Sequence, residues 1–276
     1  MRIKNLLGGN MDRKPVVAGQ FYPGNGPALR ANVAEYLKGE PSDERTLLAM
    51  VPHAGYVFSG GVAGKTIGHA NLAKRIILIG PNHTGRGQKI AVWSDGKWFA
   101  PGFEAPVDIE AAEAILQFPG FSADYEAHLY EHSLEVVLPF LGAALDDFSI
   151  VPVSVAEQDL DKLLEAGKNL AFALKKMNSD TSVVVSTDMS HYVSHDQAKK
   201  IDQLAIDQIL AMDPAGLYSV VMNNKISMCG VLAMVMGLAC VMELGAKKAG
   251  LVSYSTSGDV NNDYSKVVGY AGVLIS

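Results

Sequence analysis

The stretch IILIGPNHTG, Ile76 to Gly85, begins with an unbroken apolar run, Ile76 to Ile79. The run stops at Gly-Pro, and a histidine, His83, follows. A run this short, with Gly-Pro at its end, is typical of a buried strand that ends in a loop. Two further stretches share this layout: LLAMVPHAG (Leu47 to Gly55) and VVVSTDMSH (Val183 to His191). Three strand-like runs therefore each end in a histidine within a few residues.

Outward from these runs, strand-like and helix-like segments alternate along the chain. We expect strands at 47–51, 75–79, 149–153, 183–186, 251–256 and 267–275, and helices at 60–72 after a Ser59 cap, 108–118, 131–145, 159–177 and, as two or three helices, 195–244. Residues 90–100 indicate two strands around Asp95-Gly96, a strong hairpin signal that we place as an insertion or a sheet edge. The alternation predicts an α/β fold: a single three-layer domain whose mostly parallel central sheet has helices on both faces.

The sequence also predicts the bounds of the domain and which apolar segments are not signal or membrane segments. We expect residues 1–13 to be an N-terminal extension, with Met11 as an alternative start, and residues 14–276 to form the single domain. The N-terminus has an apolar patch of only two residues, far short of a secretory signal. The longest uncharged run, between Lys225 and Glu243, contains two glycines, and we interpret it as a buried core helix rather than a membrane span.

Charge and cysteine content narrow the function classes. The chain of 276 residues is 49% hydrophobic and has a net charge of -6, which argues against nucleic acid or anionic membrane as the main partner. Cys229 and Cys240 would lie about 16 Å apart on one helix, too far for a disulfide. This spacing and the missing signal predict a reducing cytoplasm.

The strand-end histidines are the first candidates for a site. Ligands of open α/β sheets bind outside the carboxyl ends of the strands. His53, His83 and His191 all follow such ends, so neighbouring strands would bring their imidazoles together. Convergent imidazoles indicate a metal site. A lone histidine after a strand is more often a cap or a loop hydrogen bonder, and only the coincidence of three favours a site.

His132 is a fourth candidate. It is expected to open a helix, beside Glu131 and one turn before Glu135. An imidazole and a carboxylate at a helix start suit acid–base work or support of a metal ligand. The alternative is a polar helix N-terminus, where acidic residues are favourable in any case.

Asp188 and Cys229 are the remaining candidates. Asp188 precedes His191 by three residues and would orient that histidine or ligate directly; the alternative is a helix or turn cap. Cys229 lies near the start of the apolar helix, where a thiol tends toward the thiolate that metals bind. The alternative is a small buried hydrophobe, which is our interpretation of Cys240.

Six motifs occur in the order seen in Memo-like proteins, which are called AmmeMemoRadiSam system protein B in prokaryotes. They are VAGQFYP (17–23), VPHAGYVFSG (51–60), GPNHTG (80–85), EHSLEVVLPFL (131–141), STDMSHY (186–192) and MCG (228–230). The resemblance covers the chain from about Lys14 to the last strand. The Memo-like family is similar in fold to the class III extradiol dioxygenases, the LigB-like group of α/β proteins with non-haem iron.

The resemblance implies a mononuclear metal site. His53 and His83 match the two histidine ligands, and Cys229 takes the place where the dioxygenases have a carboxylate. The expected metal is iron, with copper or zinc as alternatives because a thiolate makes the site softer.

The resemblance also implies the residues around the metal. His191 matches the acid–base catalyst of the dioxygenases, and Asp188 and His132 match residues that line the pocket. Tyr56, Phe58 and Tyr192 indicate an aromatic-lined crevice for a planar ligand, unless these rings simply pack.

Three functions follow as hypotheses. The first is a non-haem iron or copper redox enzyme or oxygenase related to the extradiol dioxygenases. The second is a non-catalytic scaffold that binds a small molecule or peptide in the crevice, with a radical-SAM enzyme and an Ammecr-type protein as partners. The third is a zinc hydrolase that uses the Asp188 and Glu131 carboxylates.

Overall fold

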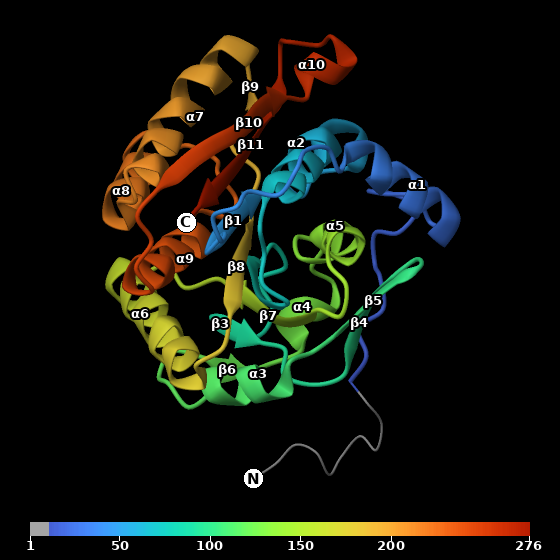
Figure 1. The fold of residues 1–276 in the computed structure, drawn as a ribbon. Helices are drawn as coiled ribbons and strands as arrows, with labels where there is room; N and C mark the ends of the chain where they lie inside the picture. The colour runs from blue at the N-terminus through green and yellow to red at the C-terminus, as the bar shows by residue number, and fades with distance from the viewer. Residues whose placement is uncertain (1–10) are drawn as a thin grey trace.

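The computed structural model describes residues 11–276 (Figure 1), so residues 1–10 of the expected extension lie outside the described part. The main sheet has nine strands: β1 (Leu48–Val51), β2 (Arg75–Pro81), β3 (Ile90–Val92), β6 (Ser122–Ala123), β7 (Ser149–Val155), β8 (Thr181–Ser186), β9 (His191–Val193), β10 (Ala249–Thr256) and β11 (Val267–Ile275). Their order is β10-β11-β1-β8-β2-β7-β3-β6, and β9 pairs with β11. The central four, β1, β8, β2 and β7, are parallel. The predicted α/β fold with a mostly parallel sheet is confirmed.

Strand β2 shows why the central runs are apolar without a break. Ile77 and Ile79 face one hydrophobic core, and Ile76 and Leu78 face the other. All four side chains are fully buried. Since successive side chains of a strand point to opposite faces, a strand covered on both sides needs apolar residues at every position.

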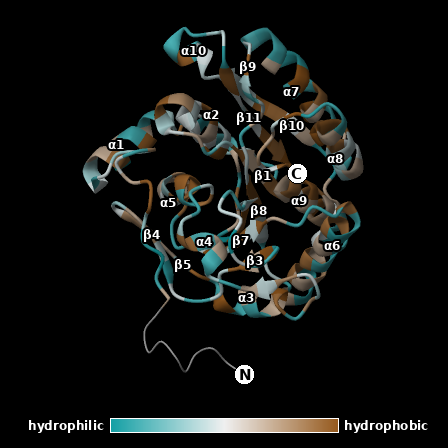
Figure 2. Ribbon diagram, turned by 180° about the vertical axis from the view of Figure 1, so that it is seen from behind, coloured by the Kyte–Doolittle hydropathy of each residue, from teal (hydrophilic) through white to brown (hydrophobic). Residues whose placement is uncertain are grey.

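Helices cover both faces and complete the three layers (Figure 1). One face holds α3 (Ile109–Ile115), α6 (Leu160–Met177), α7 (His195–Leu210), α8 (Pro214–Asn223) and α9 (Val231–Glu243), and the other holds α1 (Gly26–Tyr36), α2 (Tyr56–His69) and α5 (Leu138–Ala144). Helix α9 is hydrophobic nearly all round (Figure 2) and buried, which confirms the core-helix interpretation. None of the helices within residues 11–276 has both the length and the apolar character needed to cross a bilayer.

The predicted hairpin around Asp95-Gly96 is wrong. Strand β4 (Lys97–Ala100) pairs with β5 (Phe103–Pro106) in a separate two-stranded sheet, whereas β3 stays in the main sheet. The reason is that Trp93 donates its backbone N–H to β7, which extends the main-sheet contact past β3. The actual turn contains Gly102, whose φ of 77° suits glycine.

The expected cap at Ser59 is also wrong. Helix α2 begins at Tyr56, with Gly55 at the N-cap position. Ser59 lies inside the helix, where its hydroxyl donates to the carbonyl of Ala54 at 2.9 Å. A hydroxyl bonded back to the preceding turn no longer serves as a cap.

The expected helix at 131–145 begins later than predicted. Its first regular turn is the 3-10 helix η2 (Glu135–Val137), which leads into α5. The carboxylate of Glu131 accepts the backbone N–H groups of His132 and Ser133, both at 2.9 Å, and holds these residues in a turn. His132 therefore does not open a helix.

Two glycines give a stability test of the helix packing. A Cβ on Gly167 of α6 would lie 2.5 Å from the carbonyl oxygen of Met236 on α9, whereas a Cβ on Gly61 of α2 would meet nothing within 4 Å. We expect Gly167→Ala to lower the free energy of unfolding by about 1–3 kcal/mol. Gly61→Ala should raise it by about 0.5–1 kcal/mol, because helical glycine costs backbone entropy. Urea unfolding measures both, and equal effects would contradict the close helix approach.

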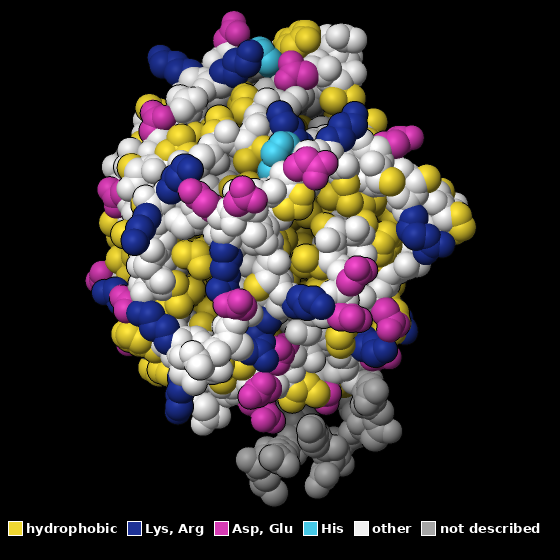
Figure 3. Space-filling model, viewed as in Figure 1, with side chains coloured by type: hydrophobic (Ala, Val, Ile, Leu, Met, Phe, Trp, Pro, Cys, Tyr) yellow, Lys and Arg dark blue, Asp and Glu magenta, His cyan; other side chains and the backbone are white. Residues whose placement is uncertain are grey.

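Charges of both signs are interspersed on the face seen in Figure 3, with apolar side chains between them.

Arg13 belongs to the expected N-terminal extension, yet its side chain is buried and paired with Glu135 at 2.7 Å. The packed part of the chain therefore includes Arg13.

Candidate metal centre

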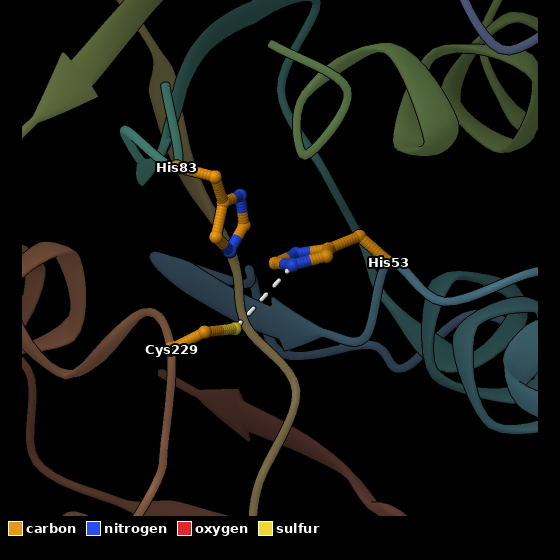
Figure 4. A group of neighbouring side chains, drawn as sticks. All are labelled: His53, His83 and Cys229. Carbon is orange, nitrogen blue, oxygen red and sulfur yellow. Dashed lines mark hydrogen bonds between the residues drawn. The ribbon is translucent and has the colours of Figure 1, made fainter. Parts of the chain in front are cut away.

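The site forms where the loops after β1, β8 and β2 meet. Because β8 lies between β1 and β2, these carboxyl-terminal loops are neighbours at one edge of the sheet. His53 and His83 come together there, with ring centroids 5.4 Å apart. Cys229, from the segment before α9, completes a group whose three ligand atoms all lie within 4.8 Å of one another (Figure 4). The structure therefore brings together His53 and His83, two of the three histidines expected to converge, and Cys229, which the family resemblance implied as the third ligand.

Hydrogen bonding determines which nitrogen of His53 is free. Its Nδ1 lies 2.6 Å from the hydroxyl of Ser186, which itself donates to the carbonyl of Ser133 at 2.7 Å. Since a hydroxyl has one proton, Ser186 accepts from His53, and Nδ1 carries the proton. Nε2 keeps its lone pair and lies 3.4 Å from Sγ of Cys229. Burial lowers the pKa of His53 well below its usual value, so the ring is neutral, as a metal ligand must be.

His83 is oriented in the same way by a carboxylate. Its Nδ1 lies 2.9 Å from Oε1 of Glu131, and its backbone N–H donates to the other oxygen. The other ring nitrogen faces His53 and Cys229 (Figure 4). A carboxylate behind a histidine raises its basicity and fixes its tautomer, which is the usual support of a metal-binding imidazole.

Glu131 supports His83, whereas sequence reasoning placed it beside His132 and as a carboxylate of the hydrolase hypothesis. It is buried and accepts four N–H groups: two from His83 and the backbone groups of His132 and Ser133. Burial alone would favour its neutral form, but these hydrogen bonds outweigh it and lower the pKa of Glu131 to about 2. His83, Glu131 and His132 form a second close group, yet Glu131 is already occupied as an acceptor.

Cys229 lies one residue before the Gly230 cap of α9. Its Sγ accepts the backbone N–H of Asp188 at 3.2 Å. The expected tendency of Cys229 toward the thiolate is wrong. Burial is the larger cause and the nearby Asp188 carboxylate the smaller one, and both raise the pKa of the Cys229 thiol. Cys240 is buried in the core, and both cysteines are free.

Asp188 supports the loop of His53. Its carboxylate accepts the backbone N–H of His53 at 2.8 Å and also bonds the backbone of Ala54. Burial raises the pKa of Asp188. Its hydrogen bonds run to the His53 loop and not to the ring of His191, which it was expected to orient.

His191 is held by a neighbouring loop. Its Nδ1 lies 2.9 Å from the carbonyl of Ser227, so this nitrogen carries the proton. Its Nε2 keeps a lone pair and can accept a proton. His191 lies three residues after Asp188, whose backbone N–H donates to Sγ of Cys229, so its loop borders the same crevice.

His132 stacks on His83, with centroids 5.0 Å apart and planes 19° apart, and lies edge-on to His53 at 5.5 Å. It thus belongs to the site without being one of the three closest ligands. Tyr56 does not line the crevice: it is buried, and its hydroxyl donates to the carbonyl of Val136 at 2.7 Å. Tyr192, in contrast, is 75% exposed beside His191.

The donor set fits a single metal ion. The imidazoles of His53 and His83, each with one ring nitrogen turned to the centre, and the sulfur of Cys229 face a common point from three loops. This set of nitrogen and sulfur donors suits iron, copper or zinc and excludes the oxygen-seeking magnesium and calcium.

Comparison with known proteins identifies relatives over nearly the whole chain. Residues 13–274 match the family model of the Memo-like proteins. A MEMO1 family protein of Methanopyrus kandleri is 39% identical over 279 residues, covering 96% of this chain and 99% of the relative. Another, from Archaeoglobus fulgidus, is 40% identical over 262 residues, covering 95% and 98%.

A solved structure shares the fold at low identity. An uncharacterized protein from Escherichia coli K12 superimposes with a TM-score of 0.55 at 14% identity, covering 82% of this chain and 99% of that one. The full-length match to the family model and to the MEMO1 relatives shows the family directly. The chain belongs to the Memo-like protein family.

Proposed function

We propose that His53, His83 and Cys229 hold one iron or copper ion, and that the protein is a metal-dependent oxidoreductase of the LigB-like dioxygenase type. The observation that carries this proposal is the matched orientation of the two histidines. Each has its Nδ1 committed to an acceptor behind it, and each leaves its other nitrogen toward the sulfur of Cys229. A reducing cytoplasm, which we also propose, keeps the Cys229 thiol available.

The residues around the metal have separate tasks. A bound iron or copper ion would supply one-electron chemistry or activate oxygen or a substrate oxygen. His191 has a free Nε2 and would take a proton from the substrate as general base. Asp188 fixes the His53 loop, and His132 holds the ring of His83 in place by stacking.

The zinc hydrolase hypothesis has less support from the geometry. It needs a carboxylate that is free to activate water. Glu131 already accepts four N–H groups, and Asp188 accepts the backbone of His53 and Ala54. Neither carboxylate has the freedom that a general base requires.

Elemental analysis of protein purified anaerobically without chelator tests the proposal. We expect about one iron or copper ion per chain in the wild type and in His69→Ala, whose half-exposed ring contacts Lys65 far from the site. His83→Ala should lose the metal. Unchanged metal content in His83→Ala would refute the site. Zinc would favour the hydrolase, and no metal even after reconstitution would favour the binding scaffold.

Ser186→Ala tests the role of the hydroxyl behind His53. Without its acceptor, the Nδ1–H of His53 is unsatisfied and the ring loses its fixed orientation. We expect metal affinity to fall roughly tenfold or more, measured by competition with a chelator. Ser182→Ala is the matched control, because this buried serine lies on the same strand but donates to Thr46. Equal affinities of the two variants would contradict the tautomer assignment.

A further inference from the structure

The loop from Thr187 to His191 is held at every backbone N–H. Five consecutive N–H groups donate to five residues outside the loop, in four different segments: Thr187 to the Val51 carbonyl (2.8 Å), Asp188 to Cys229 Sγ (3.2 Å), Met189 to the Gly269 carbonyl (2.9 Å), Ser190 to Asp202 Oδ1 (3.0 Å) and His191 to Ser227 Oγ (2.7 Å). Backbone in a loop is normally satisfied by water or by its own turn. This loop is instead fixed from outside, and the bond to Cys229 is one of its five attachments.

Asp202 is the unusual partner in this set. It lies on α7, is fully buried and also accepts the hydroxyl of Tyr254 at 2.7 Å. A Cβ on Gly269 of β11 would collide with the Asp202 carboxylate, so the neighbouring strand leaves room for it. Burial of a carboxylate is costly unless it is well hydrogen-bonded. Asp202 accepts two hydrogen bonds, and one of them comes from the loop whose Asp188 N–H donates to Cys229.

We infer that Asp202 is a positioning residue for the metal centre. By holding the N–H of Ser190, it fixes the loop so that the N–H of Asp188 points at Sγ of Cys229. The hydrogen bonds of the Asp202 carboxylate run to Ser190 and Tyr254 and not to His53, His83 or Cys229, so its link to the centre runs through the backbone of Ser190. The inference rests on the proposed metal site, because the sulfur it tunes is a proposed ligand.

The physical effect runs through the hydrogen bond to sulfur. An N–H that points at a ligating thiolate withdraws electron density from it and weakens its donation to the metal. Loss of this bond makes the sulfur a stronger donor. The sulfur-to-metal charge-transfer band then moves to longer wavelength, and the reduction potential of a redox metal falls. Affinity also falls, since the ligand loop is less well ordered.

Cobalt(II) is the probe, because its sulfur charge-transfer band reports on the thiolate without a redox reaction. In Asp202→Ala we expect the band to shift to longer wavelength and the cobalt affinity to fall roughly tenfold or more. Asp202→Asn should restore the wild-type band, since its amide oxygen accepts from Ser190 and its amide nitrogen can donate to the Tyr254 oxygen. Asp207→Ala, which removes an exposed carboxylate of the same helix bonded only to Gln203, is the control and should leave the band unchanged.

The outcomes separate this inference from the function it rests on. If the wild type binds no cobalt through sulfur, the metal site itself fails. If it does bind and Asp202→Ala leaves band and affinity unchanged, the inference is overturned while the site stands. An Asp202→Asn band shifted as far as that of Asp202→Ala would also overturn it, because the acceptor is retained. Should Asp202→Ala not fold, Tyr254→Phe removes one support of Asp202 and should shift the band in the same direction by less.

Discussion

The Cys229→Ser variant is expected to bind iron or copper at least a hundredfold more weakly than the wild type. A complete set of four zinc ligands contributes about 10–16 kcal/mol, so each ligand contributes about 3 kcal/mol or more. Serine keeps the size of cysteine but replaces a soft thiolate with a hydroxyl that stays protonated at neutral pH. The remaining imidazoles of His53 and His83 then hold the metal alone.

Competition with a chelator under anaerobic conditions measures this loss of affinity. Cys240→Ala is the matched control, because it removes the other free thiol from the buried core helix α9. That variant should bind metal as the wild type does. If Cys229→Ser bound iron or copper with unchanged affinity, the sulfur would not be a ligand, and the site would reduce to its histidines.

The second large effect is on stability. We expect Glu135→Ala to lower the free energy of unfolding by about 3–5 kcal/mol, because it leaves a buried cation without its partner. The carboxylate of Glu135 is fully buried and pairs with Arg13 at 2.7 Å. It also accepts the backbone N–H groups of Val16 and Val17 and the hydroxyl of Tyr22. One side chain thus fastens the N-terminal segment to the turn before α5.

Urea unfolding of Glu135→Ala tests this role. The surface pair of Lys97 and Glu104 provides the comparison, since both side chains are about half exposed and 2.9 Å apart. Glu104→Ala should change the free energy of unfolding by less than about 1 kcal/mol. A loss of similar size in both variants would show that the buried pair has no special weight.

The fold could be predicted from the sequence where burial on both faces leaves an unbroken apolar run. Ile76 to Ile79 is such a run, and it is strand β2 as expected. The order of strands could not be read in the same way. That β8 lies between β1 and β2 is a property of the crossovers, and it is this order that makes His53 and His83 neighbours.

Local signals failed where a distant contact decided the structure. Asp95-Gly96 is a strong turn signal, yet β4 pairs onward with β5. The Pro101-Gly102 pair after β4 is the turn signal that would have indicated the correct hairpin. The Cys229 thiol was expected to tend toward thiolate at a helix start, but burial and Asp188 oppose this before a metal binds.

The support of the two histidines lies beyond pattern reading altogether. Ser186 orients His53 because the carbonyl of Ser133, far away in sequence, takes the hydroxyl proton. Glu131 stands next to His132 in the sequence but serves His83. Residue types at strand ends therefore indicate that a site exists, whereas its tautomers and supports depend on the packed structure.

X-ray absorption at the metal edge of the iron- or copper-loaded protein tests the central claim most directly. The account predicts a single metal with imidazole scattering and one sulfur near the thiolate distance of about 2.3 Å, with the sulfur shell absent in Cys229→Ser. A metal environment of oxygen and nitrogen only, unchanged between the wild type and Cys229→Ser, would contradict a centre built from His53, His83 and Cys229.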